Sequence, residues 1–583
     1  MKRIFVIAAL ASLAFAQPVV RPPAAAYEAP TLVIPPRGDL RQVIERYEAD
    51  EATLLRFHDS PISPERWNTM RQFYRSWHNA LHAMPFEAFG IDARIEWVML
   101  NHKLDRELRH IDQAERRFQE ASPLLPFAAP ILELKRARQR VDPVDPQKAA
   151  TRLTELAKQV EELNAKAAEK QGVKKTVARR AADMTGQLRE ALKDWFDFHN
   201  GYHPLFSWWS TEPYKRLDLA LKAYSETLRE KLAGIKKEDK DTILGDPVGA
   251  KELEAELASE MIPYSPEQLI AIARQEFAWC EKEMIKASRE MGMGDDWRKA
   301  LEKVKSQHVA PGEQPGLVVS LALEAIRYMD ANDLITVPQL ARDGWRVEMM
   351  SPERQRINPF FTGGPVLSVS FPTDGMSHEQ KLMSMRGNNI HFARATVFHE
   401  VIPGHWLQDF MSERYRTHRA IFQTPFWTEG WALYWEMLLW DMGFHKTPEN
   451  RVGALFWRMH RCARIIFSLS FHLEKMSAKE CVDFLVDKVG HERENALAEV
   501  RRSFEAEYEP LYQCAYMIGA LQFRTLNYEW TGGVKSKRRQ FHDAVMQLGP
   551  MPVEMIRATL FDQRIHRDYT TEWKFLGEVK PAQ

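Results

Sequence analysis

The stretch that decides the chemistry and much of the fold is ATVFHEVIPGHWLQDF, residues 395–410, followed by TPFWTEGWALYWEMLLW, residues 424–440. The first segment contains His399, Glu400 and His405, and the second contains Glu429. A metallohydrolase needs neutral imidazoles and a carboxylate around Zn²⁺, an open position for water, and a nearby carboxylate that deprotonates this water. All four side chains of such a site are present, in an order that two neighbouring helices can supply.

The spacing of the two histidines departs from His-Glu-x-x-His, because His405 follows His399 by six positions. On an unbroken α-helix, four residues turn the chain by about 40° and six by roughly 240°, so the imidazoles would diverge. The added residues are Pro403 and Gly404. Proline clashes with the carbonyl of His399 and breaks the helix, and glycine can take a positive φ that lets the chain bulge. The spacing therefore predicts a kinked turn that re-aims His405.

The second segment carries local signals for a helix that begins just before Glu429 and ends near Trp440. Thr424 can cap this helix and Pro425 can occupy its first turn. Gly430 in the helix interior costs roughly 1 kcal/mol relative to alanine, which indicates a closely packed neighbour. The helix that carries the first histidine is the natural candidate for this neighbour.

The strings HEVIPGHWLQ, residues 399–408, and TEGWALYWE, residues 428–436, resemble the bacterial domain-of-unknown-function family numbered 885. Members of that family carry His-Glu-x-x-Pro-Gly-His and a downstream Glu-Gly-Trp-Ala, and the resemblance covers the chain from about Asp39 onward. The family is similar to a branch of the zincin metallopeptidases that use a glutamate as third ligand. The resemblance implies metal ligands at His399, His405 and Glu429, and a general base at Glu400.

Other polar side chains are candidates for a supporting role around this site. Glu436 and Asp409 are expected either to contact a ligand histidine or to form a surface salt bridge. Arg464, Ser468 and His472 recur every four residues in the apolar run RIIFSLSFHLEKM, so they line a cavity or are paired in the core. Related sequences usually have aspartate in place of Ser468. If Arg464 lacks a carboxylate partner for this reason, it can hold a substrate carboxylate instead.

Tyr512, Tyr516 and Gly519 share one face of a further predicted helix. Zincins often stabilise the tetrahedral oxyanion with a hydrogen bond from tyrosine or histidine. We therefore expect Tyr516 to be catalytic, with His472 behind it. The family more often has glutamine in place of Tyr512, which favours a role of Tyr512 in specificity. A buried structural role is the alternative for each tyrosine.

The N-terminal sequence MKRIFVIAALASLAFA has a basic start, an apolar run and a small-residue cleavage signature. It predicts a secretory signal peptide over residues 1–16, and therefore a periplasmic or extracellular protein. Residues 17–38 are rich in proline and alanine and predict a tether outside the fold. The 80 basic and 80 acidic residues form no basic run, which argues against nucleic acid as a partner. No later segment approaches twenty uninterrupted apolar residues, so we expect no stable membrane insertion.

The remaining chain predicts a mainly α-helical fold, a large zincin-like (gluzincin-type) protein with a small β-sheet beside a metal cleft. We expect an N-terminal helical region over residues 39–250 and a catalytic metal-binding region over residues 251–583, in one continuous fold. The strand signal is GPVLSVSFP, residues 364–372, and in zincins an edge strand pairs with the substrate backbone. The aromatic segment 198–214 is expected to be a buried interhelical loop, or alternatively the lining of a substrate channel. Cys462 and Cys481 are either a disulfide or buried thiols.

These observations predict an exported zinc-dependent peptidase that acts on short or unstructured peptides. Glu400 would take a proton from the metal-activated water and pass it to the leaving amine. One Zn²⁺ ion is expected, although the ligand types also suit Mn²⁺, Co²⁺ or Fe²⁺. The alternatives are a metal-dependent amidase acting on a non-protein or cell-wall peptide substrate, and a non-catalytic binding protein with structural zinc. The chain has no Gly-x-Ser-x-Gly elbow of the kind that serine hydrolases use.

Overall fold

The computed structural model describes residues 27–30, 38–167, 172–236, 242–355, 358–505 and 508–580. The predicted signal peptide and most of the predicted tether lie outside the described residues. Contacts divide the chain into two compact units. The first is built mainly from residues 53–72 and 111–238, and the second from residues 28–52, 73–110 and 239–583. This grouping does not test the predicted regions 39–250 and 251–583, which stay a prediction.

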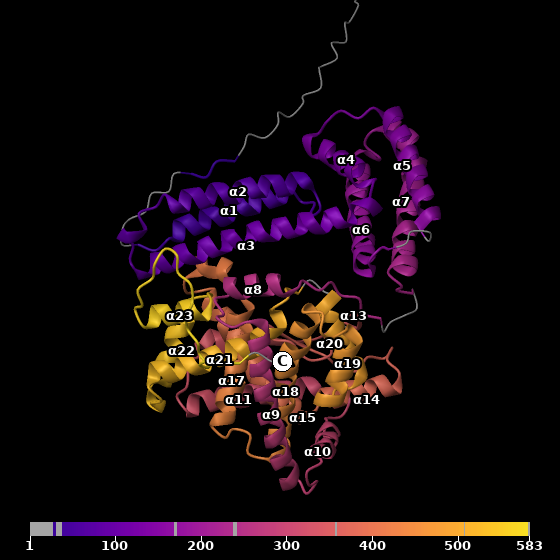
Figure 1. Ribbon diagram of the computed structural model, residues 1–583. Helices are drawn as coiled ribbons and strands as arrows, with labels where there is room; N and C mark the ends of the chain where they lie inside the picture. Colours follow the sequence, from indigo (N-terminus) through magenta and orange to yellow (C-terminus); the bar gives the residue numbers. More distant parts are fainter. Residues whose placement is uncertain are drawn as a thin grey trace, which may run out of the picture. The chain divides into compact units, whose positions relative to one another are not determined.

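The first unit is a bundle of helices in which α5, α6 and α7 lie side by side and α4 packs on α6 (Figure 1). Its core is formed by leucines and aromatic residues, among them Leu153, Leu188 and Trp195, which are buried. The charged stretch that precedes residue 167 is amphipathic, because its leucines all face this core. The helices of the unit are α4 (Ala128–Arg140), α5 (Pro146–Ala167), α6 (Lys175–His199) and α7 (Pro204–Thr227), and α1 (Arg41–Phe57), α2 (Pro64–His82) and α3 (Ile91–Ala121) contribute residues to both units.

The aromatic segment 198–214 is not a buried loop, so that prediction is wrong. It contains the end of α6 and the first turns of α7, which begins at Pro204 with the side chain of His203 accepting a hydrogen bond from the backbone N–H of Phe206. Phe206 is fully buried, whereas Trp208, two residues on, is 82% exposed. Helical geometry sends side chains two residues apart to different faces, and the density of aromatic residues conceals this alternation in the sequence.

The second unit is also mainly α-helical, as predicted, and α18 runs through its interior with almost every residue buried from Leu455 onward. Helices α9, α15 and α21 pack against α18, and α17 packs along α21 (Figure 1). The elements are α8 (Ala250–Ser259), α9 (Pro266–Glu290), α10 (Trp297–Lys305), α11 (Gln314–Ala331), α12 (Gln339–Asp343), β1 (Arg346–Met349), α13 (Pro352–Gln355), β2 (Val366–Val369), α14 (His378–Gly387), α15 (Ile390–Glu400), α16 (His405–Ser412), α17 (Pro425–Asp441), α18 (Pro448–His472), α19 (Ala478–Phe484), α20 (Arg493–Glu505), α21 (Tyr512–Thr531), α22 (Arg538–Gln547) and α23 (Val553–Leu560).

The prediction that Gly430 packs against the helix of His399 is wrong. Gly430 packs against α21 instead. A Cβ atom at Gly430 would lie 2.6 Å from the Cα of Gly519, and one at Gly519 would lie 2.2 Å from the carbonyl oxygen of Phe426. The two glycines therefore let the backbones of α17 and α21 touch. This close approach fixes the position of Glu429 relative to the tyrosines of α21.

The predicted strand is present as β2, and β1 pairs with it in parallel, with Arg346 opposite Val366 and Met349 opposite Val369. On the other side of β2, Ser368 and Thr362 exchange both backbone hydrogen bonds, at 3.0 and 3.1 Å. That edge is therefore occupied at Ser368. β1 was not predicted, because its sequence, RVEM, alternates polar and apolar residues over only four positions and three of these residues are exposed.

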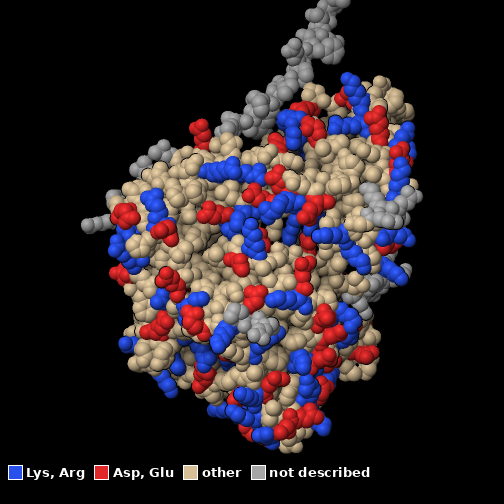
Figure 2. Space-filling model, viewed as in Figure 1, with Lys and Arg blue, Asp and Glu red and all other residues tan. Residues whose placement is uncertain are grey.

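The four cysteines are all buried free thiols. Cys462 and Cys481 are therefore buried thiols, as the second of the two expectations had it, and they form no disulfide. Basic and acidic side chains are interspersed on the face shown in Figure 2. Among the helices that the structure describes, none is both long enough and apolar enough to cross a membrane.

Candidate metal centre

The two histidines converge because the helix breaks between them. Helix α15 ends at Glu400 and α16 begins at His405, and the linking residues 401–404 include a cis peptide bond between Ile402 and Pro403. The ring centroids of His399 and His405 are 4.7 Å apart. The kinked turn that the Pro-Gly insertion predicts is therefore present, and both rings lie on the same side of it.

Gly404 is needed for close approach and not for a positive φ, which corrects the reason given for it. Its φ is −79°, which is not in the left-handed region. A Cβ atom there would lie 1.9 Å from the carbonyl oxygen of His399 and 2.4 Å from that of Phe398. The backbone N–H of Gly404 donates to the oxygen of Phe398 at 2.9 Å, which holds the turn closed.

Glu429 reaches both histidines from the neighbouring helix. The hydroxyl of Thr424 accepts from the backbone N–H of Trp427 and Pro425 opens α17, as the sequence indicates. The Oε2 atom of Glu429 is 3.2 Å from the Nε2 atom of His399 and 3.2 Å from the Nε2 atom of His405. Glu429 is buried, with 6% of its surface exposed. Three ligand atoms therefore point at one another inside the protein.

These distances fit a tetrahedral metal ion. Nitrogen and oxygen ligands about 2.0–2.1 Å from Zn²⁺ at tetrahedral angles are roughly 3.3 Å apart, close to both His–Glu separations of 3.2 Å. Within the described part of the chain, His399, His405 and Glu429 form one of two groups of potential ligands whose donor atoms lie within 4.8 Å of one another. In the other group, Glu96 already accepts hydrogen bonds from His418 and Arg419, so its carboxylate is engaged without a metal.

The ionisable groups of the cluster stabilise one another's charges. Burial opposes the charge on His399, but hydrogen bonds to Glu429 and Glu436 raise the pKa of this histidine to about 9. Burial likewise opposes the charge on Glu429, yet His405 and the hydrogen bonds of both histidines lower the pKa of this carboxyl well below its usual value. A divalent cation would replace the protons in this arrangement, since metal ligands bind in their deprotonated forms.

Glu436 orients the first histidine. Its Oε1 atom is 2.9 Å from the Nδ1 atom of His399, so Nδ1–H donates to the carboxylate, and Nε2, which faces Glu429, is the nitrogen that would bind a metal. Of the two expectations for Glu436, the contact to a ligand histidine is the one observed. Asp409 lines the cavity described next, and burial raises the pKa of its carboxyl.

His399, His405 and Glu429, the metal-ligand group, line a cavity of about 460 Å³. Glu400 lines the same cavity. The segment 358–364 forms one wall, and a Cβ atom at Gly363 would lie 2.1 Å from the carbonyl oxygen of Glu400. The described lining residues include none of β2, so this part of the chain reaches the cavity through the segment that precedes the strand. The expected pairing of substrate with the strand stays a prediction.

Two of the three accessory residues expected at the site lie in it. The ring of Tyr516 stacks on that of His399 with centroids 6.0 Å apart and an angle of 15°, and Tyr516 lines the cavity. The hydroxyl of Tyr512 donates to Oε1 of Glu429 at 2.6 Å. His472 lies at the end of α18, its ring 5.9 Å from that of Phe504, and it is not among the described residues that line the cavity. The catalytic roles of Tyr516 and His472 stay predictions.

Arg464 has a carboxylate partner that the sequence did not reveal. Its Nε donates to Oε1 of Glu499 at 2.6 Å, and both side chains are buried. Ser468, in place of the aspartate of related sequences, has its Oγ 3.9 Å from the sulfur of Cys514. The condition under which Arg464 would hold a substrate carboxylate is therefore not met. The sequence has no motif that links Arg464 on α18 with Glu499 on α20, so this ion pair could not be predicted.

We expect Tyr512→Phe to weaken metal binding by about 10- to 100-fold, the usual cost of losing an outer partner of a metal ligand. The variant removes the hydroxyl that holds Glu429 but keeps the ring. Competition with a fluorescent zinc chelator measures the affinity. Tyr508→Phe is the matched control, because Tyr508 lines the same cavity 4.4 Å from the ring of Tyr512. Equal affinities in all three proteins would contradict a role of Tyr512 in holding the ligand.

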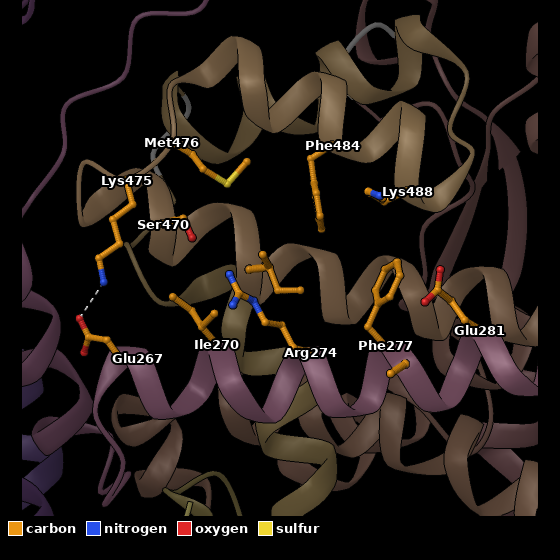
Figure 3. A pocket seen from close by; sticks show the side chains of 12 residues that line it. Glu267, Ile270, Arg274, Phe277, Glu281, Ser470, Lys475, Met476, Phe484 and Lys488 are labelled. Atoms are coloured by element: carbon orange, nitrogen blue, oxygen red, sulfur yellow. Dashed lines mark hydrogen bonds and ion pairs between the residues drawn. The ribbon is translucent and has the colours of Figure 1, made fainter. Parts of the chain in front are cut away.

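A second cavity, of about 540 Å³, lies between α9 and the segment that contains the end of α18 and α19 (Figure 3). Phe277 and Phe484 lie at one end of it, and Glu267 and Lys475 form an ion pair of 3.2 Å at the other. Neither group of potential metal ligands lines this cavity. Its charged and apolar side chains offer no group for catalysis comparable with the histidine–glutamate cluster.

Fold and site together define a mainly α-helical protein with two histidines and a glutamate converging at the wall of a cavity. The chain belongs to the family described as "Bacterial protein of unknown function (DUF885)", whose model matches residues 52–560. The resemblance that the two motifs indicate is thereby confirmed at the level of the family. No curated protein shows significant similarity to the chain.

Several solved chains share this fold, among them the following two. One is described as "a putative lipoprotein of unknown function" from Shewanella oneidensis, is 17% identical, and aligns over 90% of this chain and 100% of its own with a TM-score of 0.67. The other, "the putative lipoprotein" from Colwellia psychrerythraea, is 15% identical and aligns over 90% of this chain and 99% of its own with a TM-score of 0.58. At these identities the likeness concerns the fold alone.

Proposed function

We propose that this protein is a zinc-dependent metallopeptidase of the gluzincin type that hydrolyses short or unstructured peptides. The observation that carries the proposal is the pair of equal 3.2 Å separations between Glu429 Oε2 and the two imidazole Nε2 atoms. They match the edge of a tetrahedral site, roughly 3.3 Å. The His-Glu pair that precedes the turn adds the general base such an enzyme requires.

Zn²⁺ held by His399, His405 and Glu429 would supply Lewis acidity, which lowers the pKa of a water molecule and polarises the scissile carbonyl. Glu400, beside His399 on the cavity wall, would act as general base for the attacking water and as proton donor to the leaving amine. Tyr516 donates a hydrogen bond to the oxyanion. Burial raises the pKa of Tyr516 to about 12, so its hydroxyl keeps the proton that this hydrogen bond needs.

The surroundings of the group favour catalysis over a structural zinc site. A closed structural site has four protein ligands, whereas the group found among the described residues has three and faces a cavity. The cavity, of about 460 Å³, is within the usual range for small-ligand sites, roughly 300–1,000 Å³. This size favours short peptides or single extended segments over folded proteins.

A metal-dependent amidase acting on a cell-wall peptide is the second candidate, because it would use the same residues in the same roles. We also propose that the protein is exported to the periplasm or beyond. The predicted signal sequence of residues 1–16 supports this, and both similar structures are described as a "putative lipoprotein". No nucleic-acid partner is proposed, since the chain has equal numbers of acidic and basic residues.

Removal of the metal is the direct test. We expect the purified protein to contain about one zinc ion per chain, to lose peptide hydrolysis after dialysis against 1,10-phenanthroline, and to regain it when Zn²⁺ is added back. Dipeptides, longer peptides, amino-acid amides and muropeptides are assayed together, so that the preferred class separates peptidase from amidase. A protein that binds no divalent metal, or hydrolyses peptides equally well without it, would contradict the proposal.

A further inference from the structure

Arg461 is a buried cation in the wall of the candidate site. Its side chain is 5% exposed, and the guanidinium lies over the rings of Trp457 and Tyr516, with its carbon 5.0 and 5.1 Å from their centroids. The Nε atom is buried and has no hydrogen-bond partner among the described residues. The carboxylate within ion-pair distance is Glu436, at 3.8 Å, which is too long for a hydrogen bond.

Its neighbours on the same helix are paired differently. Arg458, three residues earlier, donates to Glu276 at 2.7 Å, and Arg464, three residues later, donates to Glu499 at 2.6 Å. Glu436 already accepts a hydrogen bond from His399, so its charge is shared with the metal centre. Arg461 therefore lacks a carboxylate of its own. A buried charge without a close partner is costly, so such a residue is retained where something else pairs with it.

The cavity offers the place for that partner. Arg461, Arg464 and Arg502 line it, together with the metal-ligand group. Glu499 accepts a hydrogen bond from Arg464 and also stabilises the charge of Arg502. One carboxylate is thus shared by two of the three guanidiniums, so this part of the wall carries a net positive charge. Through the carboxylate of Glu436, contacts of 3.8 and 2.9 Å connect Arg461 with Nδ1 of His399, and both side chains line the cavity.

We propose that Arg461 is a specificity-determining residue that binds a carboxylate of the peptide substrate in the cavity beside the scissile bond. That the ligand is a peptide rests on the proposed peptidase function, whereas the binding of a carboxylate by Arg461 does not. Guanidinium and carboxylate match in geometry and charge, because the planar fork of arginine can donate two parallel hydrogen bonds. Two sources supply such a group, the free C-terminus and an acidic side chain. A preference for the first would make the enzyme one that trims peptides from the C-terminal end.

Four matched peptides separate these sources: a free acid, its C-terminal amide, and two amides that end in glutamate or glutamine. Their binding is measured by calorimetry on Glu400→Gln, in which turnover is suppressed, and KM and kcat are measured on the protein with Glu400 intact. We expect peptides that carry the carboxylate to bind about 10- to 100-fold more tightly than their neutral counterparts, the usual range for a hydrogen bond to a charged group. Zinc content and thermal unfolding are recorded for each variant.

Arg461→Gln should abolish this preference by raising KM for the acids alone, while Arg461→Lys should restore part of it because lysine keeps the charge. Arg458→Gln is the matched control, since it removes a buried arginine of the same helix that pairs with Glu276 outside the cavity lining. If Arg461 merely positions Glu436, the variant will instead lose zinc and lower kcat equally for acids and amides, which overturns the inference. Equal binding of acids and amides by the unaltered site overturns it as well.

The two proposals fail in different ways. Hydrolysis of acids and amides with equal efficiency would leave the peptidase standing and remove the role of Arg461 in specificity. Absence of any hydrolysis, with an Arg461-dependent preference for the acids in calorimetry, would remove the peptidase and leave a carboxylate-binding site.

Discussion

Replacing Glu400 with glutamine is expected to lower kcat for peptide hydrolysis by about 10²- to 10⁴-fold, the usual contribution of a general base. Glutamine has nearly the same shape but cannot accept the proton of the attacking water. Glu400 is not one of the three converging ligands, so the metal content should stay at the level of the unaltered protein. Loss of turnover with retained metal separates a base from a ligand, which a change at either histidine cannot do.

The measurement is steady-state hydrolysis of a peptide library, paired with zinc analysis of the same preparations. Glu413→Gln is the control, because Glu413 follows the end of α16 with its side chain 70% exposed and faces Arg414. It should keep full activity. A Glu400→Gln protein with unchanged kcat would exclude the proposed reaction. One that lost its zinc together with its activity would make Glu400 a ligand and contradict the assignment made here.

The parts of the site that could be predicted are those set by neighbours in the sequence. The clash of Pro403 with the preceding turn, and the cap and first turn at Thr424 and Pro425, are local stereochemistry, so the break before His405 and the start of α17 were found. The mainly helical fold follows from periodicity for the same reason. The reason predicted for Gly404 was wrong, because sequence does not distinguish a glycine that needs positive φ from one that needs space.

What the sequence did not reveal is which distant element completes each contact. Gly430 indicated a close neighbour, but its identity depends on how α17 crosses α21. The partner of Arg464 is Glu499, on a helix with no motif to mark it. Arg461 shares the helix face of Arg464 and Ser468, but the sequence does not show which arginine of α18 lacks a carboxylate partner. In each case tertiary packing, which has no periodicity, decides the role of the side chain.

Gly404→Ala is the second change for which we expect a large effect, although it adds a single methyl group. The new Cβ atom would lie 1.9 Å from the carbonyl oxygen of His399 and 2.4 Å from that of Phe398, and both are backbone atoms that cannot rotate away. The turn must open, which moves His405 away from Glu429. We expect the free energy of unfolding to fall by about 3 kcal/mol or more, the upper end of the range for overpacking. Metal affinity should fall by more than about 100-fold, beyond the cost of losing an outer partner.

Chemical denaturation and zinc titration measure the two effects separately. The control is Gly316→Ala in α11, because a Cβ atom there would meet nothing within 4 Å. Alanine favours a helix over glycine by about 1 kcal/mol, so this variant should be slightly more stable and bind zinc normally. If Gly404→Ala bound zinc as tightly as the control, His405 would not depend on the closed turn for its position. The convergence of two imidazoles six residues apart would then need another cause than the Pro-Gly insertion.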